Sequence, residues 1–242
     1  MQVLNEQEVA QNVRAIMQQV RDTALQAGRD PSEVQVMAVT KTVDPVLVNA
    51  AIGAGITLLG ENKAQELCAK YDSYHKDGVQ IHFIGHLQTN KVRQIVDKVS
   101  MVESVDSIKL AREIDRHCAA IGKVMDVLLE VNIGREENKT GVFPELLPAL
   151  LEEAGNLEHI RVRGLMTIPP ADAERDANFR YFQEVQALYV DMNKKLFHNE
   201  LDCLSMGMSA DYPDAIRAGA TMVRVGSSLF GKRDYPQHYY AI

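Results

Sequence analysis

One lysine stands where a buried strand is expected to end. Lys41 follows the largely apolar run Val36–Thr40, so its side chain begins at the end of a buried segment rather than on a solvated helix face. Partial desolvation lowers the pKa of a lysine, and the neutral amine can form a Schiff base with a carbonyl compound. Two plainer interpretations remain open: a structural lysine that reaches solvent, and a lysine that binds a substrate phosphate.

Two later segments combine glycine with serine at the ends of apolar runs. They are Ser205–Ser209 and Gly226–Ser228. Glycine lets a ligand approach the backbone, and the N–H groups and hydroxyls there donate hydrogen bonds to phosphate oxygens. Turn formation and helix capping are the structural alternative. Their position on the last two expected strands favours phosphate, because these loops of parallel barrels frequently bind it.

A third feature is an arginine inside an apolar strand. Arg224 lies within Met222–Val225, where a guanidinium is costly unless it is paired. We therefore expect its side chain to face the barrel mouth and to meet an acceptor. The acceptor is either a carboxylate such as Glu61 or Glu130, in a structural salt bridge, or an atom of a ligand.

Other polar residues carry less functional weight. His82 and His86 are four residues apart, but strand and turn residues separate them and no third ligand is spaced nearby, so we expect no metal site. Cys203 is expected to pack in the core. The segment Asn138–Gly141 is expected to be a surface turn rather than a mobile loop over the mouth.

The hydrophobic pattern supplies alternating strands and helices as a scaffold for these residues. The expected strands are Val34–Val39, Ile56–Leu59, Ile81–Ile84, Ser100–Val105, Val124–Val131, Ile160–Met166, Leu201–Met206 and Met222–Val225. Several are apolar throughout, which is typical of strands buried on both faces. Helices are expected between them, for example over Pro45–Ala54. About eight alternations predict one α/β domain over residues 1–242, a (β/α)8 TIM-type barrel, with an open doubly wound sheet as the alternative.

An extra helix is expected before the first strand. Val9, Val13, Ile16 and Val20 recur at spacings of three and four, which places them on one helix face. The helix is expected to stop near Gly28.

Composition limits the classes of function. The chain has 242 residues, of which 46% are hydrophobic and 24% charged, as in soluble globular proteins. A net charge of −7 argues against general binding to nucleic acid or anionic membranes. No apolar run reaches the length of a membrane span, and the N-terminal segment lacks the apolar core of a signal peptide. Three scattered cysteines do not form a disulfide framework, so we expect a cytoplasmic protein.

Several motifs in order resemble the pyridoxal phosphate (PLP) homeostasis protein family, whose barrel is similar to the N-terminal domain of alanine racemase. The motifs are Ala38–Thr42, Gly60–Asn62, His82–Lys91, Arg163–Met166, Leu204–Ser209 and Met222–Gly231. Together they span nearly the whole chain.

The resemblance implies a role for each candidate residue. Lys41 would carry PLP as a Schiff base, and Arg224 would face the pyridine nitrogen. Asn62 would line the pocket near the cofactor ring. The residues that would hold the phosphate are Ser205, Gly226 and Ser227.

Two positions concern lysines that relatives carry. Many relatives have a second lysine two residues after the first, and this chain has Val43 there, which puts the route of PLP transfer in doubt. Lys139 matches a loop lysine of relatives.

The resemblance and the chemistry together favour a carrier over an enzyme. An arginine can only donate, so a pyridine nitrogen beside it must accept, which weakens the electron sink that PLP catalysis uses. The chain also leaves no room for the second domain of alanine racemase, and no paired acid and base is evident. We therefore expect no catalytic residues. The expected function is intracellular PLP homeostasis, meaning buffering or delivery of the cofactor.

Partners and alternatives follow from that expectation. Apo-forms of PLP enzymes are possible transient recipients, and the protein itself is expected to be a monomer. Two enzymatic alternatives remain: a small PLP-dependent amino-acid racemase that uses Lys41 as its base, and a Schiff-base aldolase acting on a sugar phosphate.

Overall fold

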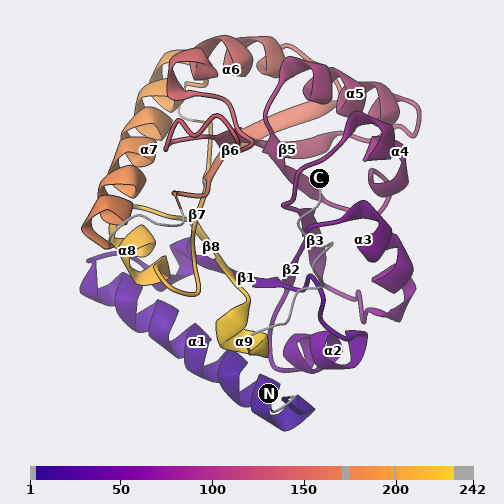
Figure 1. Ribbon diagram of the computed structural model, residues 1–242, viewed down its shortest axis with the longest axis vertical. Coiled ribbons are helices and arrows are strands. Elements are labelled where there is room, and N and C mark those ends of the chain that lie inside the picture. Colours follow the sequence, from indigo (N-terminus) through magenta and orange to yellow (C-terminus); the bar gives the residue numbers. More distant parts are fainter. Residues whose placement is uncertain (1–3, 171–174, 199, 232–242) are drawn as a thin grey trace.

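The computed structural model describes residues 4–170, 175–198 and 200–231. Within them, parallel strands close into a barrel in chain order, so that β1 pairs with both β2 and β8 (Figure 1). The strands are β1 (Gln35–Val39), β2 (Leu58–Glu61), β3 (Gln80–Phe83), β4 (Met101–Val105), β5 (Met125–Val131), β6 (Ile160–Thr167), β7 (Cys203–Met208) and β8 (Met222–Val225).

Helices follow the strands and form a ring outside the barrel (Figure 1). The α-helices are α1 (Glu6–Gln26), α2 (Pro45–Gly53), α3 (Ala64–Lys70), α4 (Val92–Ile95), α5 (Ile108–Ala119), α6 (Leu147–Gly155), α7 (Arg175–Leu196), α8 (Tyr212–Arg217) and α9 (Ser227–Phe230). The 3-10 helices are η1 (Pro31–Glu33), η2 (Tyr71–Ser73), η3 (Thr89–Lys91) and η4 (Pro144–Leu146).

Side-chain caps explain where several helices begin. Asn5 accepts from the backbone of Glu8, whose carboxylate accepts from the Asn5 backbone in return, so α1 starts with a capping box. Asp44 caps α2, and Ser107 caps α5 by accepting from Leu110 N–H. Each cap satisfies a backbone donor that the first turn of a helix leaves unpaired.

Alternation along the strands separates two packed layers. Outward-facing side chains such as Leu59, Val102 and Val223 join the large core between the barrel and the helices. Apolar inward-facing side chains pack inside the barrel; they are Met37, Leu58, Met101, Leu128, Met166, Cys203 and Met222, with Ile84 packed against them. These side chains make the barrel interior a packed core, so a ligand site is expected at its ends.

The structure confirms the barrel and shows that the open sheet is wrong. Each expected strand lies within two residues of the observed one, and β8 matches at both ends. The N-terminal helix is also confirmed, and it ends at Gln26, two residues before Gly28. Among the described residues, no helix combines the length and apolar character needed to span a membrane.

Candidate functional site

Lys41 lies just beyond the carboxyl end of β1. The strand places Met37 inside the barrel, and Lys41 lies in the turn that follows the strand at this end. Thr40 has the opposite direction, since its hydroxyl donates to Glu61 Oε1 at 2.6 Å outside the barrel. The Lys41 side chain is partly buried, as predicted for a lysine at a strand end.

The backbone around Lys41 is held in an uncommon turn. Thr42 has a φ of +59°, a left-handed conformation that β-branched residues rarely adopt. Its N–H donates to Glu66 Oε1, and Lys70 Nζ donates to the same oxygen. Lys70 Nζ also reaches the Thr40 carbonyl at 3.4 Å. Glu66 and Lys70 of α3 thus hydrogen-bond to the backbone on both sides of Lys41, at Thr42 and Thr40.

Glu61 is a fully buried carboxyl beneath this turn. One oxygen accepts from Thr40 and from Tyr74 OH, the latter at 2.6 Å, whereas Oε2 has no hydrogen-bond partner among the described residues. Burial raises the pKa of Glu61. Because Tyr74 belongs to the outer core, Glu61 faces away from the barrel interior. It is therefore not the salt-bridge partner that the sequence suggested for Arg224.

Arg224 is buried inside the barrel. Its Nη1 donates to Ser205 Oγ and its Nη2 to the Thr167 carbonyl, both at 2.7 Å. Burial lowers the pKa of Arg224, and the nearby carboxylates of Glu103 and Glu130 oppose that effect. Its direct partners among the described residues are thus a hydroxyl and a carbonyl, so a salt bridge to Glu130 is also not formed.

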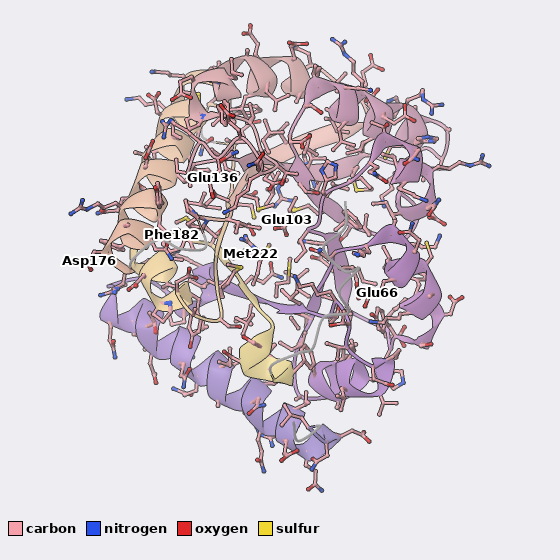
Figure 2. The ribbon with its side chains drawn as sticks, viewed as in Figure 1. Glu66, Glu103, Glu136, Asp176, Phe182 and Met222 are labelled. Atoms are coloured by element: carbon pink, nitrogen blue, oxygen red, sulfur yellow. The ribbon has the colours of Figure 1, made fainter. Side chains whose placement is uncertain are left out.

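Ser205 does not lie at the loop where a phosphate ligand was expected. Its side chain is fully buried in the barrel, where Oγ donates to Glu103 Oε2 at 2.6 Å. Glu103 Oε1 in turn lies 2.7 Å from His82 Nδ1. Glu103 comes from β4 and sits within the ring of strands (Figure 2). Sequence reasoning missed it, although a glutamate inside the run Ser100–Val105 is the same kind of signal that singled out Arg224.

The turn after β8 presents two backbone donors to one oxygen. The N–H groups of Gly226 and Ser228 donate to Ser209 Oγ at 3.1 and 3.3 Å. Ser227 between them is exposed and begins α9. A pair of amides that converges on an oxygen is a suitable arrangement for a phosphate oxygen. Ser209 therefore joins Gly226 and Ser227 at this turn, whereas Ser205 does not.

Asn62 follows β2 at the same end of the barrel. It is partly buried and lies against the turn after β3, where a Cβ added to Gly85 would come within 2.1 Å of the Asn62 carbonyl oxygen. The glycine is thus required for the close approach of the two loops.

Glu130 and the loop after β5 close another side of the mouth. Thr140 Oγ1 donates to Glu130 Oε1 at 2.8 Å, and Val142 N–H donates to the Glu130 carbonyl. Burial raises the pKa of Glu130 to about 7. Lys139, in the same loop, forms an ion pair with Glu136 at 2.5 Å. This segment is therefore anchored to a buried carboxyl, and is more than the surface turn that the sequence predicts.

Strand pairing brings the two most informative turns together. Ala38 of β1 is in register with Val225 of β8, so Lys41 and Gly226 follow neighbouring strands at one end. Arg224 lies two residues before Gly226 in the sequence, with its side chain inside the barrel. The arrangement gathers an amine, a pair of backbone amides and a buried guanidinium, which suits a ligand with a carbonyl, a phosphate and a nitrogen acceptor.

Comparison with known proteins places this geometry in a family. Residues 4–234 match the model of the alanine racemase N-terminal domain. A curated pyridoxal phosphate homeostasis protein of Pseudomonas aeruginosa is 41% identical over 227 residues, covering 94% of this chain and 96% of that protein. One of Aquifex aeolicus is 38% identical over 220 residues, covering 91% and 96%.

Solved structures of other proteins show the same fold. The structure of PipY of Synechococcus elongatus with PLP bound superposes with a TM-score of 0.80 and 31% identity, covering 92% of this chain and 100% of that one. The alanine racemase of Corynebacterium glutamicum shares the fold, with a TM-score of 0.70 at 16% identity, and this chain covers 65% of it. The sequence resemblance is thus confirmed, and the chain belongs to the pyridoxal phosphate homeostasis protein family.

Proposed function

We propose that this chain is a single PLP-binding barrel domain over residues 1–242 that holds PLP through Lys41 and acts in PLP homeostasis. The observation that carries the proposal is the position of Lys41, in a turn that Glu66 and Lys70 of α3 hold and that follows the strand next to β8, after which the amide pair lies. A relative in the same family has been solved with PLP bound. When bound, the cofactor supplies an aldehyde that a lysine amine can take as a Schiff base.

The other site residues hold the remaining parts of the cofactor. The amides of Gly226 and Ser228 and the hydroxyls of Ser209 and Ser227 hold the phosphate. Arg224 donates to the pyridine nitrogen, and Asn62 lines the pocket near the ring. Ser209 is assigned to the phosphate in place of Ser205, because the Ser205 side chain is buried inside the barrel and bonded to Glu103 and Arg224. The amides of Gly226 and Ser228, which donate to Ser209 Oγ in this structure, would exchange that oxygen for a phosphate oxygen.

The role we propose is buffering or delivery of the cofactor, without catalysis. Arg224 has only donors, so its partner nitrogen stays unprotonated and the electron sink stays weak. The curated relatives are named for homeostasis. Transfer to apo-forms of PLP enzymes, a cytoplasmic location and a monomeric state remain predictions of the same proposal.

The proposal is tested by PLP titration of the purified chain and of Lys41→Ala. We expect the absorption band of lysine-bound PLP in the wild type and its loss in Lys41→Ala. Lys109→Ala, at an exposed position of α5, is the matched control and retains the band. An unchanged band in Lys41→Ala would remove the basis of the proposal.

The racemase alternative is separated by a second assay. The PLP-loaded protein is incubated with L-alanine in deuterated water, and exchange of the α-proton is followed by NMR. We expect no exchange above that caused by free PLP. Rapid exchange that disappears in Lys41→Ala would instead establish an enzyme.

A further inference from the structure

A row of buried polar side chains crosses the barrel interior beneath the site. It runs from Arg224 of β8 through Ser205 of β7 and Glu103 of β4 to His82 of β3, with contacts of 2.7, 2.6 and 2.7 Å. All four side chains are at least 97% buried. The inward-facing sulfur and aliphatic side chains around the row leave it little access to water.

The donor and acceptor types of these groups fix the direction of every hydrogen bond in the row, and we call this direction the polarity of the row. A guanidinium only donates, so Ser205 Oγ accepts from Arg224. The Ser205 hydroxyl must then donate to Glu103, since a carboxylate only accepts. The second oxygen of Glu103 requires a donor as well, which makes His82 Nδ1 the protonated ring nitrogen.

The row also supplies charge compensation. A buried guanidinium is stable only near a compensating negative charge, and Glu103 provides it through the bridging hydroxyl. The other ionisable groups that act on Arg224 are Glu130 of β5, Asp211 of the loop after β7 and Cys203 of β7. Among the described residues, only Glu103 is linked to Arg224 through a shared hydrogen-bonded hydroxyl.

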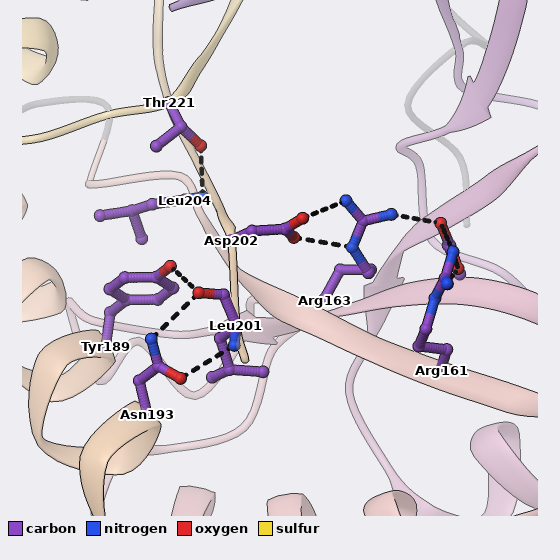
Figure 3. A network of polar contacts seen from close by, with 9 residues as sticks. Arg161, Arg163, Tyr189, Asn193, Leu201, Asp202, Leu204 and Thr221 are labelled. Atoms are coloured by element: carbon purple, nitrogen blue, oxygen red, sulfur yellow. Dashed lines mark hydrogen bonds and ion pairs between the residues drawn. The ribbon is translucent and has the colours of Figure 1, made fainter. Parts of the chain in front are cut away.

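The His82 end of the row reaches the opposite end of the barrel. A cavity of about 1140 Å³ lies there, between α1, η1 and the starts of the strands. Its lining includes His82, Gln35, Gln80, Met101, Asp126 and Arg163. Arg163 forms ion pairs with Asp202 (Figure 3) and with Asp126, and all three residues line the cavity. His82 lines this cavity, and no hydrogen bond of its Nε2 is found among the described residues.

We propose that Ser205, Glu103 and His82 are positioning residues that fix Arg224 toward the pyridine nitrogen of PLP, from an end of the barrel that the cofactor does not touch. The proposal rests on the proposed function, because it assumes that Arg224 faces the cofactor. Each hydrogen bond in the row has a fixed donor and a fixed acceptor. The row therefore fixes the direction in which the Arg224 guanidinium points.

The test compares Ser205→Ala and Glu103→Gln with the wild type. Cys203→Ala is the matched control, because Cys203 lies on the same strand and face as Ser205 and makes no hydrogen bond to the row among the described residues. Burial raises the pKa of Cys203, so its thiol is neutral and its loss removes no charge near Arg224. We expect the two row variants to bind PLP roughly 10- to 100-fold more weakly, as for loss of a hydrogen bond to a charged group. We also expect a shifted absorption and emission spectrum of the bound cofactor, whereas Cys203→Ala keeps both properties.

A second readout needs neither PLP nor a variant that might fail to fold. In the PLP-free wild type, ¹⁵N NMR of the histidine rings reports which nitrogen of His82 is protonated. The polarity of the row requires a proton on Nδ1, and Glu103→Gln is expected to disturb that assignment. An unprotonated Nδ1 in the wild type would overturn the proposal.

The outcomes separate the two proposals. If Lys41 fails to bind PLP in the wild type, the proposed function is refuted. The protonated nitrogen of His82 still tests the hydrogen-bond directions in the row. If Lys41 binds PLP and folded Ser205→Ala and Glu103→Gln match Cys203→Ala in affinity and spectrum, the row has no positioning role.

Discussion

At the scale of single residues, the site depends on buried carboxyls that are satisfied in different ways. Glu103 accepts with both oxygens, whereas Glu61 has one oxygen without a partner among the described residues. Glu130 has a hydroxyl partner, and burial still raises its pKa to about 7. Glu130 responds to pH because folding changes its proton affinity.

The raised pKa of Glu130 predicts a pH dependence of stability. Between pH 4.5 and 7 the folded chain holds the Glu130 proton more tightly than the unfolded chain, so its free energy of unfolding falls as pH rises through this window. The full effect is about 3 kcal/mol. Glu130→Gln keeps an acceptor for Thr140 and removes the titration, so its stability varies less across the window.

Denaturant unfolding at a series of pH values measures this difference. Glu145→Gln, at an exposed position, is the control and should follow the wild type. Parallel stability curves for the wild type and Glu130→Gln would show that Glu130 does not titrate in this range.

Residue types at strand ends predicted much of the site, but their partners were not predictable. Lys41 and Arg224 stand out because a charge interrupts an apolar run. The contact of Ser205 with Glu103 could not be predicted, because Glu103 is 102 residues away in the sequence and only barrel closure brings the two together. The contact of Glu66 with Thr42 could not be predicted either, because the two residues are distant in the sequence and only the fold brings them together.

At the scale of elements, strand and helix bounds followed the sequence closely, but one irregularity did not. The pairing of β5 with β6 shifts register between Val127 and Leu128, opposite Gly164. A Cβ added to Gly164 would lie 1.7 Å from the Cys203 carbonyl oxygen, so β7 can approach β6 only at a glycine. Periodicity shows where a strand lies, and it does not show how closely its neighbour approaches.

Gly164→Ala is therefore expected to be strongly destabilising. The backbone of β7 must move to admit the methyl group, and we expect a loss of about 3 kcal/mol or more, comparable to severe overpacking. Thermal unfolding of Gly164→Ala and Gly53→Ala measures the effect. Gly53 has no atom within 4 Å of an added Cβ, so its substitution should be nearly neutral. Equal melting temperatures for the two variants would show that β6 and β7 do not meet as closely as described.

At the scale of the whole molecule, α1 ties the first and last parts of the chain together. It lies along α9, α8 and α2 at one side of the barrel (Figure 1). Asn12 Nδ2 donates to the Leu229 carbonyl at 3.0 Å. Beyond the helix, Arg29 Nη1 donates to the carbonyls of Ile216 and Ala220 at 2.9 and 2.7 Å. The sequence predicted the helix, but an amphipathic stripe does not reveal which neighbours it covers.

Arg29→Ala tests this tie. The substitution removes the side-chain donor of the Ala220 carbonyl, just before β8, and one of two donors of the Ile216 carbonyl in α8, which keeps the N–H of Gly219. We therefore expect the free energy of unfolding to fall by about 1–3 kcal/mol. Denaturant unfolding compares it with Arg14→Ala, an exposed position on α1. A loss no larger than that of Arg14→Ala would mean that these bonds contribute nothing to stability.

The central claim is that the whole barrel serves to present one lysine to PLP. The most direct measurement is borohydride reduction of the PLP-loaded chain, followed by peptide mass spectrometry. The prediction is a reduced pyridoxyl phosphate group on the peptide that carries Lys41, and its absence from the peptides of Lys139 and Lys70. An unmodified Lys41 under saturating PLP would contradict the claim and favour the aldolase alternative.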